Sequence, residues 1–311
     1  MSANGSDLSL ARFRSPRYWP TWLLLAGLKV SAHLPYPVQL ALGRVIGAIL
    51  WILSRRRRRI AAINLRACFP ELSAEQHRRL LRRHFDAIGM SVIELGIAWF
   101  MPFERLRRLV RIEGLEHLER AQREGRGILA VSAHFTPLDV GFAALKGIGP
   151  GLSGMYRNQR NAMMDVLVRR GRARYTDEQF PRDDVRGLLR ALKRGKMVVY
   201  LPDQTYVGNQ SALLSFFGEP AMTNIAVTKL AKLGRATVLP YLTRRLPGLA
   251  GYEVTIGPPL EGVPSDDPIR DTRLWLDVLE SRIRVAPEQY LWVYKKFKSR
   301  PPPLPDLYRE L

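Results

Sequence analysis

The sequence VSAHFTPLD, at residues 131–139, joins the end of an apolar strand to the beginning of a helix. Residues 127–131, GILAV, are apolar or small throughout, which predicts a buried strand. Thr136, Pro137 and Asp139 fall at the cap, first and third positions of a helix that we expect to continue to about residue 146. A strand, a turn and a helix in this order are typical of an α/β domain.

His134 lies in the turn of this unit, with four residues between it and Asp139. A carboxylate that accepts a hydrogen bond from one imidazole nitrogen fixes the tautomer and leaves the other nitrogen basic. Such a histidine can remove a proton from an alcohol, so the spacing indicates a general base with Asp139 as its partner. A structural interpretation stays open, in which Thr136 and Asp139 form a capping box and His134 is an ordinary polar residue.

Short apolar runs alternate with helical patterns after this unit. Helices are predicted near 160–172 and at 183–194, and a longer helix is predicted upstream at 73–100. Further strands are predicted at LSGMYR (152–157), KMVVYL (196–201), ATVLPYL (236–242) and YEVTIG (252–257). The alternation predicts an α/β fold with a mixed, largely parallel sheet flanked by helices. Reactive groups of such sheets gather in the loops at strand ends.

Residues 19–53 are predominantly apolar, and Pro35 and Pro37 divide them into two parts. Each part is shorter than the roughly 20 residues that a straight bilayer crossing needs. A tilted or kinked span, a re-entrant pair and an interfacial anchor all fit the pattern. The length and flanks are not typical of a secretory signal peptide. We therefore expect an N-terminal helical membrane anchor at residues 1–60 and a second domain at 61–311.

The chain of 311 residues has 49 Lys and Arg against 28 Asp and Glu, a formal net charge of +21. This excess predicts an anionic partner, either nucleic acid or a membrane. The apolar segment favours the membrane and argues against nucleic acid. Arg55–Arg59 directly follow it, and such a run prefers the cytoplasmic side, beside anionic headgroups. Basic residues precede the segment as well, so its orientation stays open, as does a solvated run without a special partner.

Cys68 is the only cysteine, which excludes an intrachain disulfide and fits a reducing compartment. We expect it to be a small buried residue near a helix end. The five histidines form no zinc pattern with it, so we expect no metal. The glycine-rich residues 147–154 follow a helix rather than a strand, so we expect no dinucleotide cofactor.

The arrangement of His134 and Asp139 resembles the H-x-x-x-x-D/E signature of the glycerolipid acyltransferase superfamily. Other segments narrow the resemblance to one branch, and they cover the chain from about residue 15 to 302. They are RYWPTWL (17–23), RRRRRIAAINLRACFPELS (55–73), GMYRNQRNAMMD (154–165), YLPDQTYVGNQSALLSFFGEPAMT (200–223) and PEQYLWVYKKFKSRP (287–301). In this order they are similar to the late acyltransferases of lipid A biosynthesis, the lauroyl-type enzymes of Gram-negative bacteria.

The resemblance implies an enzyme of the bacterial inner membrane whose catalytic domain, residues 61–311, lies on the cytoplasmic side. The acyl donor would be a thioester on acyl carrier protein, without a further cofactor. The acceptor would be a hydroxyacyl hydroxyl on an anionic lipid A precursor of the Kdo-lipid IVA type. His134 would take the proton from that hydroxyl, Asp139 would stabilise the imidazolium, and no acyl-enzyme would form.

Several other residues are expected at the substrate. Arg157 follows a predicted strand and is a candidate for steadying the oxyanion or clamping a phosphate, with a generic surface arginine as the alternative. Asn161 and Asp165 lie in the same family-like segment, although Ala162 stands where the family shows proline. Asp203 and Gln204 follow a predicted strand, where Asp203 would bind a sugar hydroxyl or orient a basic neighbour, or form an Asx turn.

Basic residues elsewhere are expected to steer the two anionic partners. They are Arg169, Arg170, Lys295, Lys296 and Lys298. The family often shows His-Arg-Arg where this chain has Tyr294, Lys295 and Lys296, so a bidentate phosphate contact there is in question. Two rival functions stay open, namely an acyltransferase for another glycolipid or a lysophospholipid, and a non-enzymatic basic membrane-binding protein.

Overall fold

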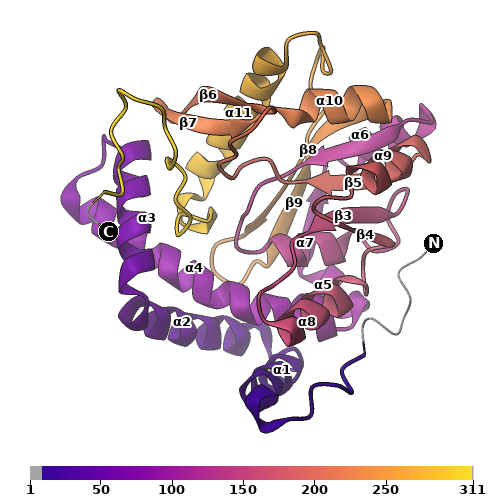
Figure 1. The fold of residues 1–311 in the computed structure, drawn as a ribbon. Coiled ribbons are helices and arrows are strands. Elements are labelled where there is room, and N and C mark those ends of the chain that lie inside the picture. Colours follow the sequence, from indigo (N-terminus) through magenta and orange to yellow (C-terminus); the bar gives the residue numbers. More distant parts are fainter. Residues whose placement is uncertain (1–8, 310) are drawn as a thin grey trace.

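The computed structural model describes residues 9–309 and 311, and its centre is a seven-stranded sheet (Figure 1). In spatial order the strands are β1 (Val110–Glu113), β9 (Tyr252–Ile256), β8 (Ala236–Arg245), β2 (Gly127–Val131), β5 (Met197–Tyr200), β3 (Leu152–Tyr156) and β4 (Glu178–Pro181). Within this sheet, neighbouring strands from β8 to β4 are parallel, β1 is parallel to β9, and β8 and β9 are antiparallel. The predicted mixed, largely parallel sheet is thus confirmed.

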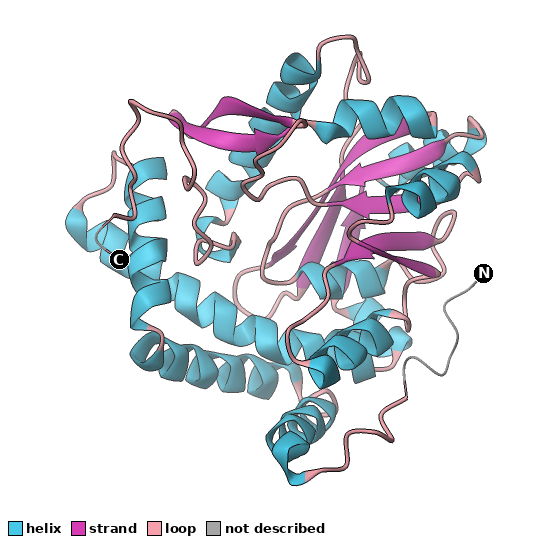
Figure 2. Ribbon diagram, viewed as in Figure 1, coloured by secondary structure: helices cyan, strands magenta, loops and turns pink. Residues whose placement is uncertain are grey.

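Helices cover both faces of the sheet (Figure 2). Those after residue 100 are α5 (Phe103–Arg108), α6 (Leu115–Arg123), α7 (Leu138–Ala144), α8 (Ala162–Arg172), α9 (Val185–Lys193), α10 (Ala226–Gly234) and α11 (Pro268–Val285), with the short helix η3 (Pro287–Gln289) after them. A hairpin of β6 (Ser211–Phe216) and β7 (Glu219–Asn224) lies apart from the main sheet. The predicted helices near 160–172 and at 183–194 correspond to α8 and α9.

The two faces of β2 belong to two different hydrophobic cores, because neighbouring strand residues point to opposite sides. Leu129 and Val131 pack with α9, α10 and α11, whereas Ile128 and Ala130 pack with α6 and α7. Burial on both faces explains why the sequence of this strand is apolar throughout. The strand is thereby fixed in the middle of the molecule, and the turn that follows it is held from both sides.

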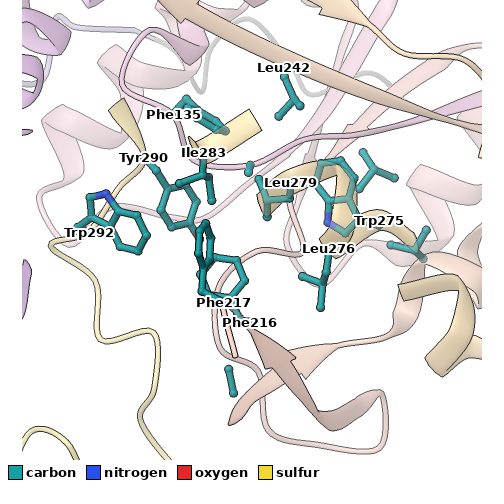
Figure 3. Close-up of a cluster of buried hydrophobic side chains, with 14 of the residues drawn as sticks. Phe135, Phe216, Phe217, Leu242, Trp275, Leu276, Leu279, Ile283, Tyr290 and Trp292 are labelled. Atoms are coloured by element: carbon teal, nitrogen blue, oxygen red, sulfur yellow. The ribbon is translucent and has the colours of Figure 1, made fainter. Parts of the chain in front are cut away.

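Aromatic side chains of the first core attach the C-terminal segment to the turn that carries His134 (Figure 3). Phe135 forms a β-bridge with Tyr290, and their rings meet edge to face with centroids 5.7 Å apart. Tyr290 also packs against Trp292 and Phe216. This cluster brings residues near 290 next to residues near 134.

The N-terminal part consists of the short helix η2 (Pro16–Tyr18) and four longer helices. These are α1 (Trp19–Ser31), α2 (Tyr36–Leu53), α3 (Arg55–Cys68) and α4 (Ala74–Phe100). The helix predicted at 73–100 is α4, which begins with a capping box of Ser73 and Gln76. Cys68 is the buried last residue of α3, as expected. The predicted domain boundary at residue 60 falls inside α3. Among the described residues, only α2 is long and apolar enough to cross a membrane.

Candidate active site

The turn after β2 is held by main-chain hydrogen bonds on both sides of His134. Ser132 donates to the carbonyl of Tyr200 at the end of β5, at 2.9 Å. The carbonyl of His134 accepts from Leu291 at 2.9 Å, and the amide of Thr136 donates to Gln289 at 2.8 Å. The Thr136 amide is thus bonded to Gln289, and no side chain of the described residues caps the helix. The helix therefore begins at Leu138, one residue later than predicted.

The carboxylate that contacts the His134 ring is that of Asp203. Nδ1 of His134 lies 2.7 Å from Oδ1 of Asp203, and the main-chain amide of His134 donates to Oδ2 at 3.0 Å. Asp203 is buried, whereas the His134 side chain is 33% exposed. Both carboxylate oxygens are therefore occupied by His134, which leaves Nε2 as the ring nitrogen available to a substrate.

The environment makes His134 more basic than a free histidine. Burial lowers its pKa, but the charge of Asp203 and the hydrogen bond to it outweigh this effect, so the pKa lies above the ordinary value. For Asp203, burial raises the pKa, while the charge of His134 and its hydrogen bonds bring it below the ordinary value. The pair thus combines a basic imidazole with an ionised carboxylate, as a general base requires.

Asp139 has different partners, which corrects the predicted pairing with His134. Its carboxylate binds the Arg172 guanidinium through two hydrogen bonds of 2.9 and 3.1 Å and accepts from the Tyr175 hydroxyl at 2.5 Å. Burial raises the pKa of Asp139, but the Arg172 charge lowers it below the ordinary value. Asp139 holds Arg172 in place, and it affects His134 only through its charge, which raises the pKa of His134 less than Asp203 does.

A second cation lies behind Asp203. Lys296 is only 2% exposed, its Nζ donates to the main-chain carbonyl of Asp203 at 2.7 Å, and it lies 4.6 Å from the Phe216 ring centroid. Burial lowers its pKa to about 8, opposed by the charge of Asp203. The expected role of Lys296 in steering a partner is therefore wrong, since its charge is enclosed in the core and fixes the Asp203 loop.

His134 lines a cleft of about 1160 Å³ between the ends of β3 and β5 and helices α8 and α10. Its apolar wall includes Leu138, Phe142, Val199, Leu230 and Leu233. Five basic side chains and a single acidic one, Asp183, also line it. The basic residues are Arg157, Arg172, Arg182, Lys229 and Lys298. The cleft exceeds the roughly 300–1,000 Å³ of common small-molecule pockets, and it suits a ligand with apolar chains and negative charges.

The remaining predicted substrate residues divide into two groups. Arg157 and Gln204 line the cleft. Asn161 caps α8 by accepting from the amides of Met163 and Met164, and Asp165 accepts from the amide of Gln159 at 2.7 Å. Asn161 and Asp165 thus shape the loop that presents Arg157 rather than line the cleft. Asp203 does not line the cleft either, and its carboxylate contacts the His134 ring, an arrangement that fits the second role predicted for it, orienting a basic neighbour.

Arg172, Tyr175 and Tyr290 are site residues that sequence reasoning missed. Arg172 is one of several arginines between residues 169 and 174, and nothing in that run distinguishes it. Tyr290 packs against Phe135, and burial together with the charge of Asp203 raises its pKa well above the ordinary value, so it stays a neutral phenol. Within residues 9–309 and 311, no group of three or more His, Cys, Asp and Glu side chains is arranged to hold a metal ion.

Comparison with known proteins gives this geometry its context. The family model of the bacterial lipid A biosynthesis acyltransferases matches residues 9–299. The lipid A biosynthesis lauroyltransferase of Escherichia coli (strain K12) is 37% identical, over 94% of this chain and 96% of the relative. The palmitoleoyltransferase of the same strain is also 37% identical, over 95% and 96%, and its myristoyltransferase is 27% identical, over 93% and 90%. The chain therefore belongs to the bacterial lipid A biosynthesis acyltransferases.

Proposed function

We propose that this acyltransferase moves a fatty acyl chain from an acyl carrier protein thioester to a hydroxyacyl hydroxyl of an anionic lipid A precursor of the Kdo-lipid IVA type. The observation that carries the proposal is the His134–Asp203 pair at the wall of a large cleft that is partly apolar and strongly basic. The thioester supplies an activated carbonyl, so no cofactor and no metal is required. The protein works at the cytoplasmic side of the bacterial inner membrane.

The reaction follows from the free ring nitrogen of His134. Nε2 accepts the proton of the acceptor hydroxyl while its oxygen attacks the thioester carbonyl, and the Asp203 carboxylate stabilises the imidazolium. The tetrahedral intermediate then expels the carrier thiolate. This thiolate accepts from Nε2 the proton that came from the acceptor hydroxyl. The products are a lipid ester and the free carrier thiol, and no acyl-enzyme is needed.

The charges around the cleft support an anionic acceptor and an acidic carrier. Arg172, which Asp139 holds on the cleft wall, would stabilise the oxyanion, a role expected above of Arg157. Arg157 lies exposed at the cleft, which suits a phosphate of the acceptor. Exposed Lys298 would attract the acidic carrier from solution. The apolar wall suits an acyl chain.

Exchange of His134 for Ala should lower acyl transfer by at least about a hundredfold, since general bases contribute about 10² to 10⁴ in rate. Purified enzyme would be incubated with tetraacylated precursor and acyl carrier proteins of several chain lengths, and the product weighed by mass spectrometry. His33→Ala, at an exposed histidine outside the cleft, is the matched control and should retain full activity. Substantial turnover by the His134→Ala variant would refute the assignment.

The same assay decides the acceptor. A lysophospholipid or another glycolipid, offered with the same donors, should gain no acyl chain. If one of these is acylated while the lipid A precursor is not, the proposed acceptor is wrong, although the proposed role of His134 is not.

A further inference from the structure

The outward face of α2 is apolar along its whole length. Its exposed large side chains recur at steps of three and four residues, as one stripe of a helix requires. These side chains, which we call the α2 stripe, have exposed fractions from 39% to 74%. They are Val38, Leu42, Val45, Ile49, Ile52 and Leu53. Trp19, Leu23, Leu24 and Val30 of α1 are exposed as well. Monomeric soluble proteins rarely expose such a continuous apolar surface, which marks an interaction site.

The opposite face of α2 is joined to α4 by contact between main chains. A Cβ atom added to Gly89 of α4 would lie 2.1 Å from the amide nitrogen of Gly47 and 2.2 Å from the carbonyl oxygen of Gly43. The two helices lie side by side at the edge of the molecule, with α4 between α2 and the sheet (Figure 1). No lipid can enter this contact, so α2 offers only its outer face to a membrane.

Both ends of α2 are attached to the same body. Before it, Arg105 of α5 donates to the carbonyls of Ala32 and His33 at 3.3 and 3.2 Å. After it, Asn64 of α3 donates to the carbonyls of Trp292 and Tyr294 at 2.6 and 2.7 Å. A helix that crossed a bilayer would place its two ends about 27 Å apart on opposite sides. A catalytic domain on one side of the membrane cannot contact both ends of α2 in that arrangement.

The charge around the stripe identifies its partner. Residues 9–70 contain 11 Lys and Arg and no Asp or Glu. Arg55, Arg56, Arg57 and Arg59 are exposed directly after α2. Arg44, in the middle of α2, lies about 130° around the helix from the centre of the stripe at 100° per residue. At that angle its guanidinium reaches the headgroups when α2 lies flat, whereas in a crossing helix it would lie at the costly centre of the bilayer.

We propose that α1 and α2 lie in the plane of one leaflet of an anionic membrane, with the α2 stripe immersed and the arginines among the headgroups, and that neither helix crosses the bilayer. This inference rests on the membrane association proposed above and specifies its geometry. The catalytic domain thereby stays beside a single membrane surface, the one in which its lipid acceptor lies.

Depth-dependent fluorescence quenching tests the geometry. Single cysteines would replace Val38, Val45 and Ile52 in full-length protein carrying Cys68→Ala and His134→Ala, and each would be labelled with a fluorophore. The probe membranes are vesicles of phosphatidylethanolamine and phosphatidylglycerol, with nitroxide lipids at shallow or deep positions. All three labels should report the same shallow depth. A label at Val45 that lies deepest, between shallow ends, would overturn the proposal in favour of a crossing helix.

A charge variant tests whether a membrane covers the α2 stripe. Val45→Asp combined with Ile49→Asp should weaken vesicle binding at least tenfold. The matched control is Ile269→Asp, at an exposed aliphatic residue of α11, and it should bind normally. Vesicles of phosphatidylcholine alone should bind at least tenfold more weakly. If the stripe variant binds vesicles normally, or if unmodified protein forms dimers through the stripe and leaves vesicles unbound, the proposal fails. Label depth and vesicle binding are both measured without acyl transfer, so a failure of this proposal is distinguishable from a failure of the proposed reaction.

Discussion

At the scale of single residues, the sequence singled out His134 but not the carboxylate that contacts its ring. His134 stands out because a histidine follows directly after a buried strand. The spacing to Asp139 favours a local pair, yet Asp139 binds Arg172 and Tyr175, whereas His134 takes Asp203, 69 residues further along the chain. Local spacing gives no information about a carboxylate that follows another strand. The sequence therefore offered the orientation of a basic neighbour as only one of three roles for Asp203.

Lys296 is a positioning residue whose removal should affect turnover more than substrate binding. Lys296→Met leaves the buried carbonyl of Asp203 without its donor, which should cost about 1–3 kcal/mol of unfolding free energy. A displaced Asp203 should lower kcat by about tenfold, because small errors of position are costly in catalysis, and leave KM little changed. Urea unfolding and steady-state kinetics measure the two effects.

Lys295→Met is the matched control, because Nζ of Lys295 lies 5.1 Å from the Tyr308 ring centroid and makes no hydrogen bond or ion pair within the described residues. It should leave both kcat and the unfolding free energy nearly unchanged. If Lys296→Met raises KM and leaves kcat intact, Lys296 acts on the substrate rather than through Asp203.

At the scale of helices and strands, the hydrophobic pattern predicted most of the fold. The strand predicted at 127–131 is β2, and those predicted at 152–157, 196–201, 236–242 and 252–257 correspond to β3, β5, β8 and β9. The helix predicted from Pro137 begins one residue later and ends at Ala144, because tertiary hydrogen bonds replace the expected cap. The pattern did not show that α2 has two apolar faces, since the inner face is defined by glycines that meet α4.

Gly89 should tolerate no side chain. Gly89→Ala places a methyl group against the main chain of α2, which cannot yield without separating the helices, so we expect a loss of about 1–3 kcal/mol of unfolding free energy. Gly27 of α1 has open space around its Cβ position, so Gly27→Ala should be neutral or stabilise by up to about 1 kcal/mol. Denaturant unfolding compares the two variants, and equal effects would contradict the close packing of α2 on α4.

At the scale of the whole molecule, the site is formed by segments that lie far apart in the sequence. The turn at His134, the loop at Asp203 and the C-terminal segment at Lys296 are joined by hydrogen bonds that span 69 and 93 residues. The resemblance to the acyltransferase family located each of these segments, but it did not reveal which side chains pair. Residue types and strand ends are visible in a sequence, whereas the partner of a charge depends on the finished fold.

The central claim is that Asp203 makes the His134 imidazole basic enough to activate a lipid hydroxyl. The pH dependence of kcat/KM tests it, because only neutral His134 can accept the proton, so activity should rise as the pH increases through the raised pKa of His134. Asp203→Asn removes the charge that opposes burial. The acidic limb of the profile should then move to lower pH, and the plateau should fall by about a hundredfold.

Asp139→Asn provides the comparison, because Asp139 raises the pKa of His134 less than Asp203 does. Its acidic limb should move less than that of Asp203→Asn. A larger shift for Asp139→Asn, or an unchanged profile for Asp203→Asn, would contradict the account.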